Sequence, residues 1–169
     1  MTTAADPKPA EADDVARMWD VMENERTVFL ITQNGAGPHA RPMWAIVRKD
    51  EGCIWFLTDK ATAKDDEIEK DGRCALVFTN GGSTHLAVTG SATIVDDRRV
   101  IKDLWTIPAK AFFPDGPEDT AIVAIRVAPV IAELWDGPSA PIALVQMAAA
   151  LVTGKSAADM GRNVEARLD

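Results

Sequence analysis

A succession of short β-rich runs, each bounded by glycine or polar turn residues, constrains the fold of this chain more than any other feature. Residues 27–32 and 39–48 flank Asn34-Gly35-Ala36-Gly37 and therefore predict a hairpin. The strands expected after this hairpin span residues 53–57, 74–79, 86–94, 121–127 and 130–135. Pro129 separates the last two because it cannot donate a hydrogen bond within a central ladder, so we expect a bend or an edge there.

Two helices are expected before and between the early strands. The first begins with Asp13 or Asp14 as its cap, and its apolar residues recur at helical spacing as Val15, Met18, Trp19 and Met22. The second spans residues 63–70, with Thr62 as its cap. Its acidic segment, Asp65-Asp66-Glu67, is expected to face water.

Two further helices are expected in the second half of the chain. Asp96 or Asp97 caps the first of them, which carries an apolar face, and a loop rich in Pro and Phe then runs to Glu118. The last helix covers residues 142–152 and ends at Gly154, after which the chain is polar.

Six or seven short strands in hairpin order with a few short helices predict a mainly β fold of the α+β kind, built on a closed antiparallel sheet. A length of 169 residues suits one globular domain. We expect a flexible tail over residues 1–12, the barrel domain over residues 13–137, and a C-terminal helix with a polar tail over residues 138–169.

The charge and hydropathy of the chain exclude several partners. A formal net charge of -8 repels a polyanion, so nucleic acid is not an expected partner. The longest nearly apolar stretch, residues 141–152, is shorter than the roughly 20 residues that span a bilayer, and no secretory signal opens the chain. We therefore expect a cytoplasmic protein without a membrane partner.

Few residues are available for metal binding or nucleophilic catalysis. Cys53 and Cys74 lie in apolar strand-like runs and are expected to be buried thiols, and His39 and His85 have none of the spacings of zinc ligands. We expect no metal site. No acid, base or nucleophile stands out as a catalytic residue.

Two motifs carry chemical information, and the second of them points to an anion. Residues 39–44, which include Arg41 and Pro42, combine an arginine with a proline that interrupts a strand, a pattern also typical of an edge strand with a solvent-exposed arginine. The second motif places Thr62 and Lys64 at the start of a helix, where free N–H groups and the helix dipole favour a phosphate. Taken alone, the second motif is more commonly a simple helix cap.

Taken in chain order, these motifs resemble the pyridoxamine 5′-phosphate oxidase-like split barrels, which bind flavin mononucleotide (FMN), over about residues 15–137. The resemblance implies a split β-barrel that forms a homodimer with FMN at the interface. It is nearest to the general stress protein 26 branch, on the following motifs: Val95-Asp96-Asp97, Leu104-Trp105, Phe112-Phe113-Pro114-Asp115-Gly116 and Leu134-Trp135-Asp136.

The resemblance also assigns the residues of the flavin site. It implies phosphate contacts for Arg41 and Lys64, hydroxyl donors in Thr58 and Thr62 next to Leu57, and ring contacts for the backbone of the segment Pro42, Met43 and Trp44. It implies that His85 and Trp135 reach the flavin from the facing subunit. The other aromatic side chains Trp19, Trp55 and Trp105 are expected to pack in the core.

The chain departs from the oxidase at the substrate side of the site. Ile46 stands where the oxidase has a substrate-binding lysine, the chain contains no tyrosine, and Ala63 replaces one basic residue of the phosphate clamp. We therefore expect a flavoprotein that is not a true pyridoxamine phosphate oxidase. The function that we infer is a flavin-dependent oxidoreductase of the general stress type on an unknown substrate. The alternatives are a flavin-sequestering protein, a barrel that uses F420 or haem, and a structural dimer without cofactor.

Overall fold

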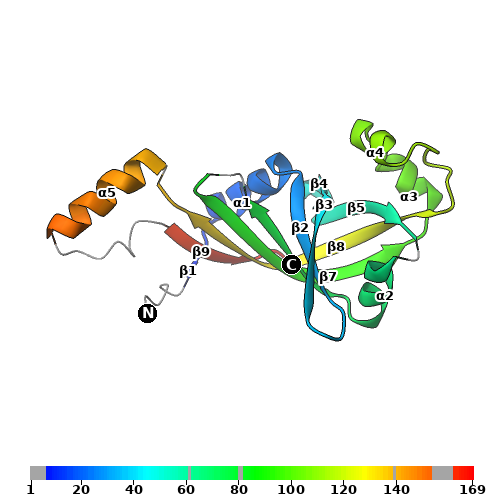
Figure 1. Cartoon of the computed structure of the whole chain (residues 1–169), viewed down its shortest axis with the longest axis horizontal. Coiled ribbons are helices and arrows are strands. Elements are labelled where there is room, and N and C mark those ends of the chain that lie inside the picture. Colours follow the sequence, from blue (N-terminus) through cyan, green and yellow to red (C-terminus); the bar gives the residue numbers. More distant parts are fainter. Residues whose placement is uncertain (1–6, 61, 80–81, 139, 154–161) are drawn as a thin grey trace.

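The structure is a computed structural model that describes residues 7–60, 62–79, 82–138, 140–153 and 162–169 (Figure 1). Within these residues nine strands join in one sheet, more than the six or seven expected, and five α-helices accompany it. The strands are β1 (Lys8–Pro9), β2 (Thr27–Gln33), β3 (Pro38–Trp44), β4 (Ile46–Arg48), β5 (Cys53–Asp59), β6 (Arg73–Thr79), β7 (Thr84–Val95), β8 (Ile122–Asp136) and β9 (Arg162–Arg167). The helices are α1 (Ala12–Asn24), α2 (Ala63–Lys70), α3 (Arg98–Asp103), α4 (Ile107–Phe112) and α5 (Ala140–Thr153).

The sheet closes into a barrel at Ala45. The single strand expected over residues 39–48 is in fact two strands, β3 paired with β2 and β4 paired with β5, and this expectation was therefore wrong. Ala45 between them is fully buried, and its N–H donates to the Arg26 carbonyl at 2.7 Å. Because β5 also pairs with β8, and β8 is linked through β7 and β6 to β2, this break completes the ring of a split barrel.

Strand β8 runs unbroken past Pro129, so the two separate strands expected at 121–127 and 130–135 are one. The expected bend is a β-bulge: Thr89 is opposite Ile131 but Gly90 is opposite Pro129, which leaves Val130 extra. Before the bulge β8 pairs with β5 and β7, and after it with β7 and β9. At the bulge the strands approach so closely that a Cβ on Gly90 would lie 2.2 Å from the Ala128 carbonyl oxygen.

Two apolar cores lie on the two faces of β5. Ile54 and Phe56 point into the barrel, where α1 covers the main core with Met18, Trp19 and Met22. The alternate residues Cys53 and Trp55 point to a second core beneath α3. Both faces of β5 are therefore covered, which explains why its sequence is apolar throughout instead of alternating. Trp19 and Trp55 are core residues, as expected.

The two chain ends contribute more than the polar tails expected from the sequence. β9 lies in the segment expected to be a polar C-terminal tail and pairs with β8, while β1, within the N-terminal segment, pairs with β9. Arg162 of β9 donates at 2.7 Å to Asp14, which is buried at the start of α1. The expectation that Asp13 or Asp14 would cap this helix was wrong. Instead Glu11 is the cap, and its N–H donates to the Asp14 carboxylate at 3.0 Å.

The other helices follow the sequence with one exception. α2 has the expected bounds, and the Asp97 carboxylate caps α3 by accepting from the Arg99 N–H at 2.7 Å. α4 lies inside the segment expected to be a loop, and it begins with Thr106 as its cap and a proline in its first turn. α5 matches the last expected helix, whereas Gly154 lies outside the described residues. None of the described helices is both long and apolar enough to cross a membrane.

Candidate functional site

A cavity of about 220 Å³ opens where the end of β5 meets the break between β3 and β4. α4 forms the opposite wall. The lining residues are Met43, Trp44, Ile46, Leu57, Thr58, Asp59, Thr106, Ala109, Phe112 and Phe113. The walls are mostly apolar, with two hydroxyls and one carboxylate among them, which is the composition of small-molecule sites in proteins.

The structure brings four of the expected site residues together in this cavity. Met43 and Trp44 come from the end of β3, and Leu57 and Thr58 from the end of β5. The wall that α4 and Phe113 provide was not expected from the sequence. The cap-and-proline pattern Thr106-Ile107-Pro108 was the available signal for this helix.

The cavity is too small to enclose a whole cofactor. Ligand pockets usually measure about 300 to 1,000 Å³, and this one has about 220 Å³ and is open to the surface. By itself this cavity could therefore hold only part of a molecule of flavin size.

The expected phosphate residues Thr62 and Lys64 follow β5 closely in the sequence, but they are not among the residues that line the cavity. Thr62 and Lys64 are half-buried at the start of α2. Lys60, just before them, forms an ion pair with Asp96 at 2.6 Å. The hydroxyl and ammonium groups at this helix start suit an anion, so the residues present fit a flavin phosphate next to an apolar cavity for its ring.

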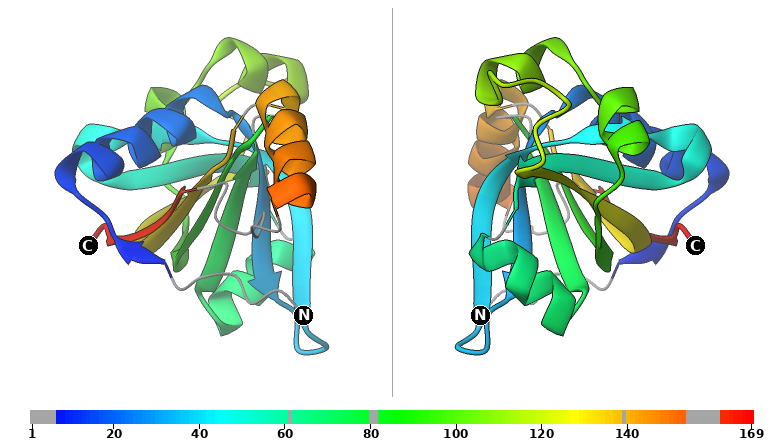
Figure 2. Two further views of the ribbon diagram at one scale, coloured as in Figure 1. Left: turned by 90° about the vertical axis from the view of Figure 1, so that its left-hand side faces the viewer. Right: turned by 90° about the vertical axis from the view of Figure 1, so that its right-hand side faces the viewer.

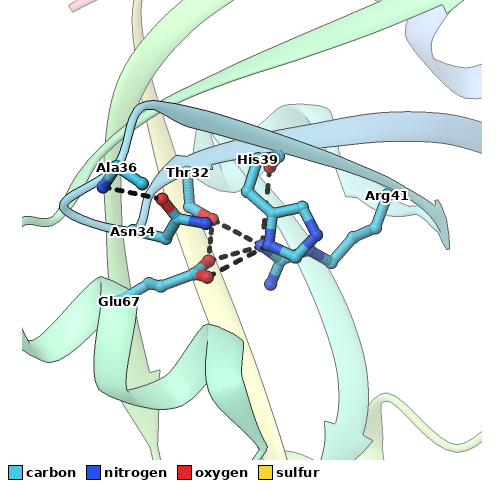
Figure 3. Close-up of polar contacts among 6 residues, drawn as sticks. All are labelled: Thr32, Asn34, Ala36, His39, Arg41 and Glu67. Atoms are coloured by element: carbon cyan, nitrogen blue, oxygen red, sulfur yellow. Dashed lines mark hydrogen bonds and ion pairs between the residues drawn. The ribbon is translucent and has the colours of Figure 1, made fainter.

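Arg41 lies in a polar cluster that ties the β2–β3 hairpin to α2 (Figure 3). Its Nη2 donates to the Thr32 hydroxyl at 2.9 Å and pairs with the Glu67 carboxylate, which also accepts from Thr32. The Nδ1 atom of His39 lies 3.1 Å from the second oxygen of Glu67. The expectation that Glu67 faces water was wrong, because its side chain is only 7% exposed and its carboxylate is the centre of this cluster.

The charge state of Glu67 follows from these contacts. Burial alone would raise the pKa of the Glu67 carboxyl, but hydrogen bonds from Thr32, Arg41 and His39, together with the charge of Arg41, lower that pKa to about 2. Glu67 is therefore ionised at neutral pH and compensates the Arg41 guanidinium.

Arg41 is neither a solvent-exposed arginine nor a residue of the cavity wall. Its side chain is 16% exposed, and its Nε atom is buried without an acceptor among the residues that the structure describes. The Nε–H group of Arg41 is thus a buried donor in addition to the Nη2 group that binds Glu67 and Thr32. The role on the flavin phosphate remains a prediction for this residue.

His85 and Trp135 are paired across strands β7 and β8, far from the cavity of their own chain. Thr58 in the cavity is opposite Val123 of β8, and Trp135 lies twelve residues further along that strand. At about 3.3 Å per residue this corresponds to roughly 40 Å of strand. Along β8, Trp135 is thus well separated from the cavity residue Thr58, and its contact with a flavin remains a prediction.

The antiparallel barrel that splits at Ala45, with an apolar cavity beside the split, defines the split-barrel class of proteins. The chain matches the family model described as pyridoxamine 5′-phosphate oxidase like over residues 13–159. It belongs to this family.

Comparison with known proteins supports the same placement. The curated protein bli-3 from Neurospora crassa is 30% identical over 114 residues, which are 62% of this chain and 54% of that protein, so the chain spans about half the length of this relative. A structure from Jannaschia sp. CCS1, named a general stress protein 26, has a TM-score of 0.69 and 24% identity, and the match covers 94% of this chain and 99% of that one. The general stress FMN/FAD binding protein from Xanthomonas citri has a TM-score of 0.66 and 27% identity over 73% of this chain and 89% of its own.

Proposed function

We propose that this chain is a homodimeric, cytoplasmic flavoprotein of the general stress type that binds FMN between its two subunits. The observation that carries the proposal is the separation along β8: about 40 Å of strand lies between the cavity residue Thr58's partner Val123 and Trp135, which favours a common ligand held by two chains. The name of the Xanthomonas citri relative, an FMN/FAD binding protein, supports flavin as this ligand. The two cysteines are free and buried, in keeping with a reducing compartment.

Each part of the site has a distinct task in this proposal. Met43, Trp44 and Leu57 pack against the flavin ring, and the apolar α4 wall excludes water from it. Thr58 and Thr62 donate hydroxyl hydrogens, and Lys64 balances the phosphate charge. When bound, FMN supplies the redox chemistry, as a flavin-dependent oxidoreductase requires, and the chain supplies position and electrostatics.

The same geometry disfavours pyridoxine phosphate as the substrate. Ile46, at the position of the lysine in the oxidase, lines the cavity and is almost fully buried. An apolar side chain there offers a phosphorylated substrate no charge-assisted hydrogen bond.

A hybrid dimer tests the shared site directly. In the proposal, Trp44→Ala damages the cavity and Trp135→Ala damages the part supplied by the partner, so each variant alone binds FMN weakly at both sites. A dimer of one subunit of each kind has one site with both lesions and one site with neither. Mixing the unfolded variants and refolding them therefore restores tight FMN binding at about a quarter of the sites if the subunits pair at random.

FMN titration by flavin fluorescence measures this restoration, and each variant refolded alone is the control. No recovery on mixing, with both variants folded, would show that the two tryptophans act within one chain or not at all. Parallel titrations with FAD, F420 and haem compare the cofactors that this barrel was expected to accommodate.

A further inference from the structure

Helix α5 is an apolar helix that projects into solvent. It contains no charged residue, and the exposed side chains include Ile142, Leu144, Val145 and Met147, with Leu144 and Val145 each 70% exposed. It packs extensively on no other element of the described chain. A helix without a polar face is usually buried, whereas the exposed apolar side chains of α5 are not covered by the part of the chain that the structure describes.

A second set of exposed apolar side chains lies on α4 and β3, which line the cavity, and on β2, which pairs with β3. We call it the cavity rim: Ile107 and Phe112 of α4, Trp44 of β3 and Phe29 of β2. Ile107 and Phe112 are 89% and 69% exposed. In the described chain, the exposed large hydrophobic residues all belong either to α5 or to the cavity rim. Exposed apolar patches of this kind mark interaction surfaces.

The two patches lie on one side of the molecule but at opposite ends of it. Figure 1 shows α5 at one end of the long axis and α4 near the other. Figure 2 shows α5, α4 and the β2–β3 hairpin along the same side, with α1 on the other side. α5 therefore cannot cover the rim of its own chain. A two-fold axis through that side brings each α5 to the other rim, because in such a dimer every contact occurs twice.

We propose that α5 of one subunit packs on the cavity rim of its partner and closes the mouth of the flavin cavity, an inference that rests on the proposed dimer. The contact joins Leu144 and Val145 to Ile107 and Phe112, and so adds a wall that one chain lacks. It also explains why an uncharged helix follows β8 directly after Trp135, which the same dimer brings to the partner's site.

The chemistry of α5 favours a protein partner over a lipid surface. Interfacial helices carry a polar face rich in Lys and Arg, whereas α5 has no basic residue and the chain has a net charge of -8. With 14 residues it is also shorter than the roughly 20 needed to span a bilayer.

The size of the contact sets the expected strength. The 14 residues of α5 form a helix about 21 Å long and about 10 Å wide, with a footprint of roughly 200 Å². One α5 and one rim per subunit then provide about half of the roughly 800 Å² that a stable dimer buries on each partner. Other surfaces of the subunit have to supply the rest, so loss of the α5 contact weakens the dimer without abolishing it.

Cysteine cross-linking between subunits tests the contact. Val145→Cys and Ile107→Cys single variants are mixed at high concentration and treated with a short bismaleimide, since the native Cys53 and Cys74 are buried. We expect a covalent dimer from this mixture. The control replaces Ile107→Cys by Glu23→Cys, which is exposed on α1 on the other side of the molecule, and yields no covalent dimer.

A second variant reports the same contact without a cross-link. Leu144→Gln with Val145→Gln keeps a helical sequence and is expected to raise the dimer dissociation constant about tenfold or more, and to expose bound FMN to iodide quenching. A protein that sediments as a dimer with FMN but gives no α5 cross-link overturns this inference and leaves the proposed function intact. Monomeric protein overturns both. Flotation with phosphatidylcholine vesicles that the double variant abolishes would assign α5 to a lipid surface instead.

Discussion

Glu67 is the residue on which the position of Arg41 depends. The Glu67 carboxylate contacts Arg41, Thr32 and His39. These contacts connect strands β2 and β3 to helix α2. Removing the charge leaves the Arg41 guanidinium, 16% exposed, without its counterion. We expect Glu67→Gln to lower the free energy of unfolding by about 2 to 4 kcal/mol. Urea denaturation measures it, and Glu69→Gln, an exposed neighbour on the same helix, should change stability by less than about 0.5 kcal/mol.

The same carboxylate gives the protein a defined acid sensitivity. The pKa of Glu67 is about 2 in the folded protein and near its ordinary value of 4.5 when unfolded. A folded pKa below the unfolded one stabilises the fold above the unfolded value, and this stabilisation disappears as the pH falls from about 4.5 towards 2. Stability measured from pH 7 to pH 3 should therefore fall more steeply in the native protein than in Glu67→Gln. Equal slopes would show that Glu67 is not the group responsible.

Lys64 is the cation that the proposed site places nearest the flavin phosphate. Hydrogen bonds to charged groups contribute about 1.5 to 3 kcal/mol, so Lys64→Ala should weaken FMN binding roughly ten- to hundredfold. Riboflavin, which has no phosphate, should bind both proteins equally. Lys70→Ala, in the last turn of the same helix, is the matched control. An unchanged FMN affinity in Lys64→Ala would place the phosphate elsewhere.

At the scale of elements, the sequence predicted what local patterns encode. Capping residues predicted the bounds of α2 and the Asp97 cap of α3. The alternation of apolar and polar residues predicted most of strand β7. The strands β1 and β9 were missed because they are short, polar and stabilised by pairing with distant residues. The break at Ala45 was missed for a similar reason: β3 and β4 diverge only because they pair with different strands.

The candidate site was predictable to the same extent. Four cavity residues lie in strands whose order the sequence reveals. The α4 wall and the partner of Arg41 depend on tertiary packing, and Glu67 resembles its exposed neighbour Asp66 in every local respect. Only the fold distinguishes the two carboxylates.

The bulge between β7 and β8 is the element most sensitive to a single added methyl group. A Cβ at Gly90 would clash with backbone atoms of Ala128 and Pro129. Backbone atoms cannot relieve such a clash by changing a side-chain rotamer. We expect Gly90→Ala to destabilise the fold by about 1 to 3 kcal/mol. Thermal unfolding measures the loss. Ser91→Ala, one residue along the same strand and exposed, serves as the control and should leave the melting temperature almost unchanged.

At the scale of the whole molecule, the absence of a cation at position 46 limits the chemistry. The purified protein loaded with FMN should produce pyridoxal phosphate from pyridoxine phosphate at a negligible rate, because Ile46 provides no charged contact for the substrate phosphate. Absorbance of the aldehyde product measures the rate. Robust turnover would mean that another residue binds the substrate phosphate.

In the proposed dimer, two chains together form each flavin site. Analytical ultracentrifugation monitored at the flavin absorbance band tests it most directly, because it reports the mass of the species that carries FMN. FMN is expected to sediment with a dimer, twice the 18.2 kDa chain, with one FMN per subunit. Stoichiometric FMN on a species of 18.2 kDa would contradict it.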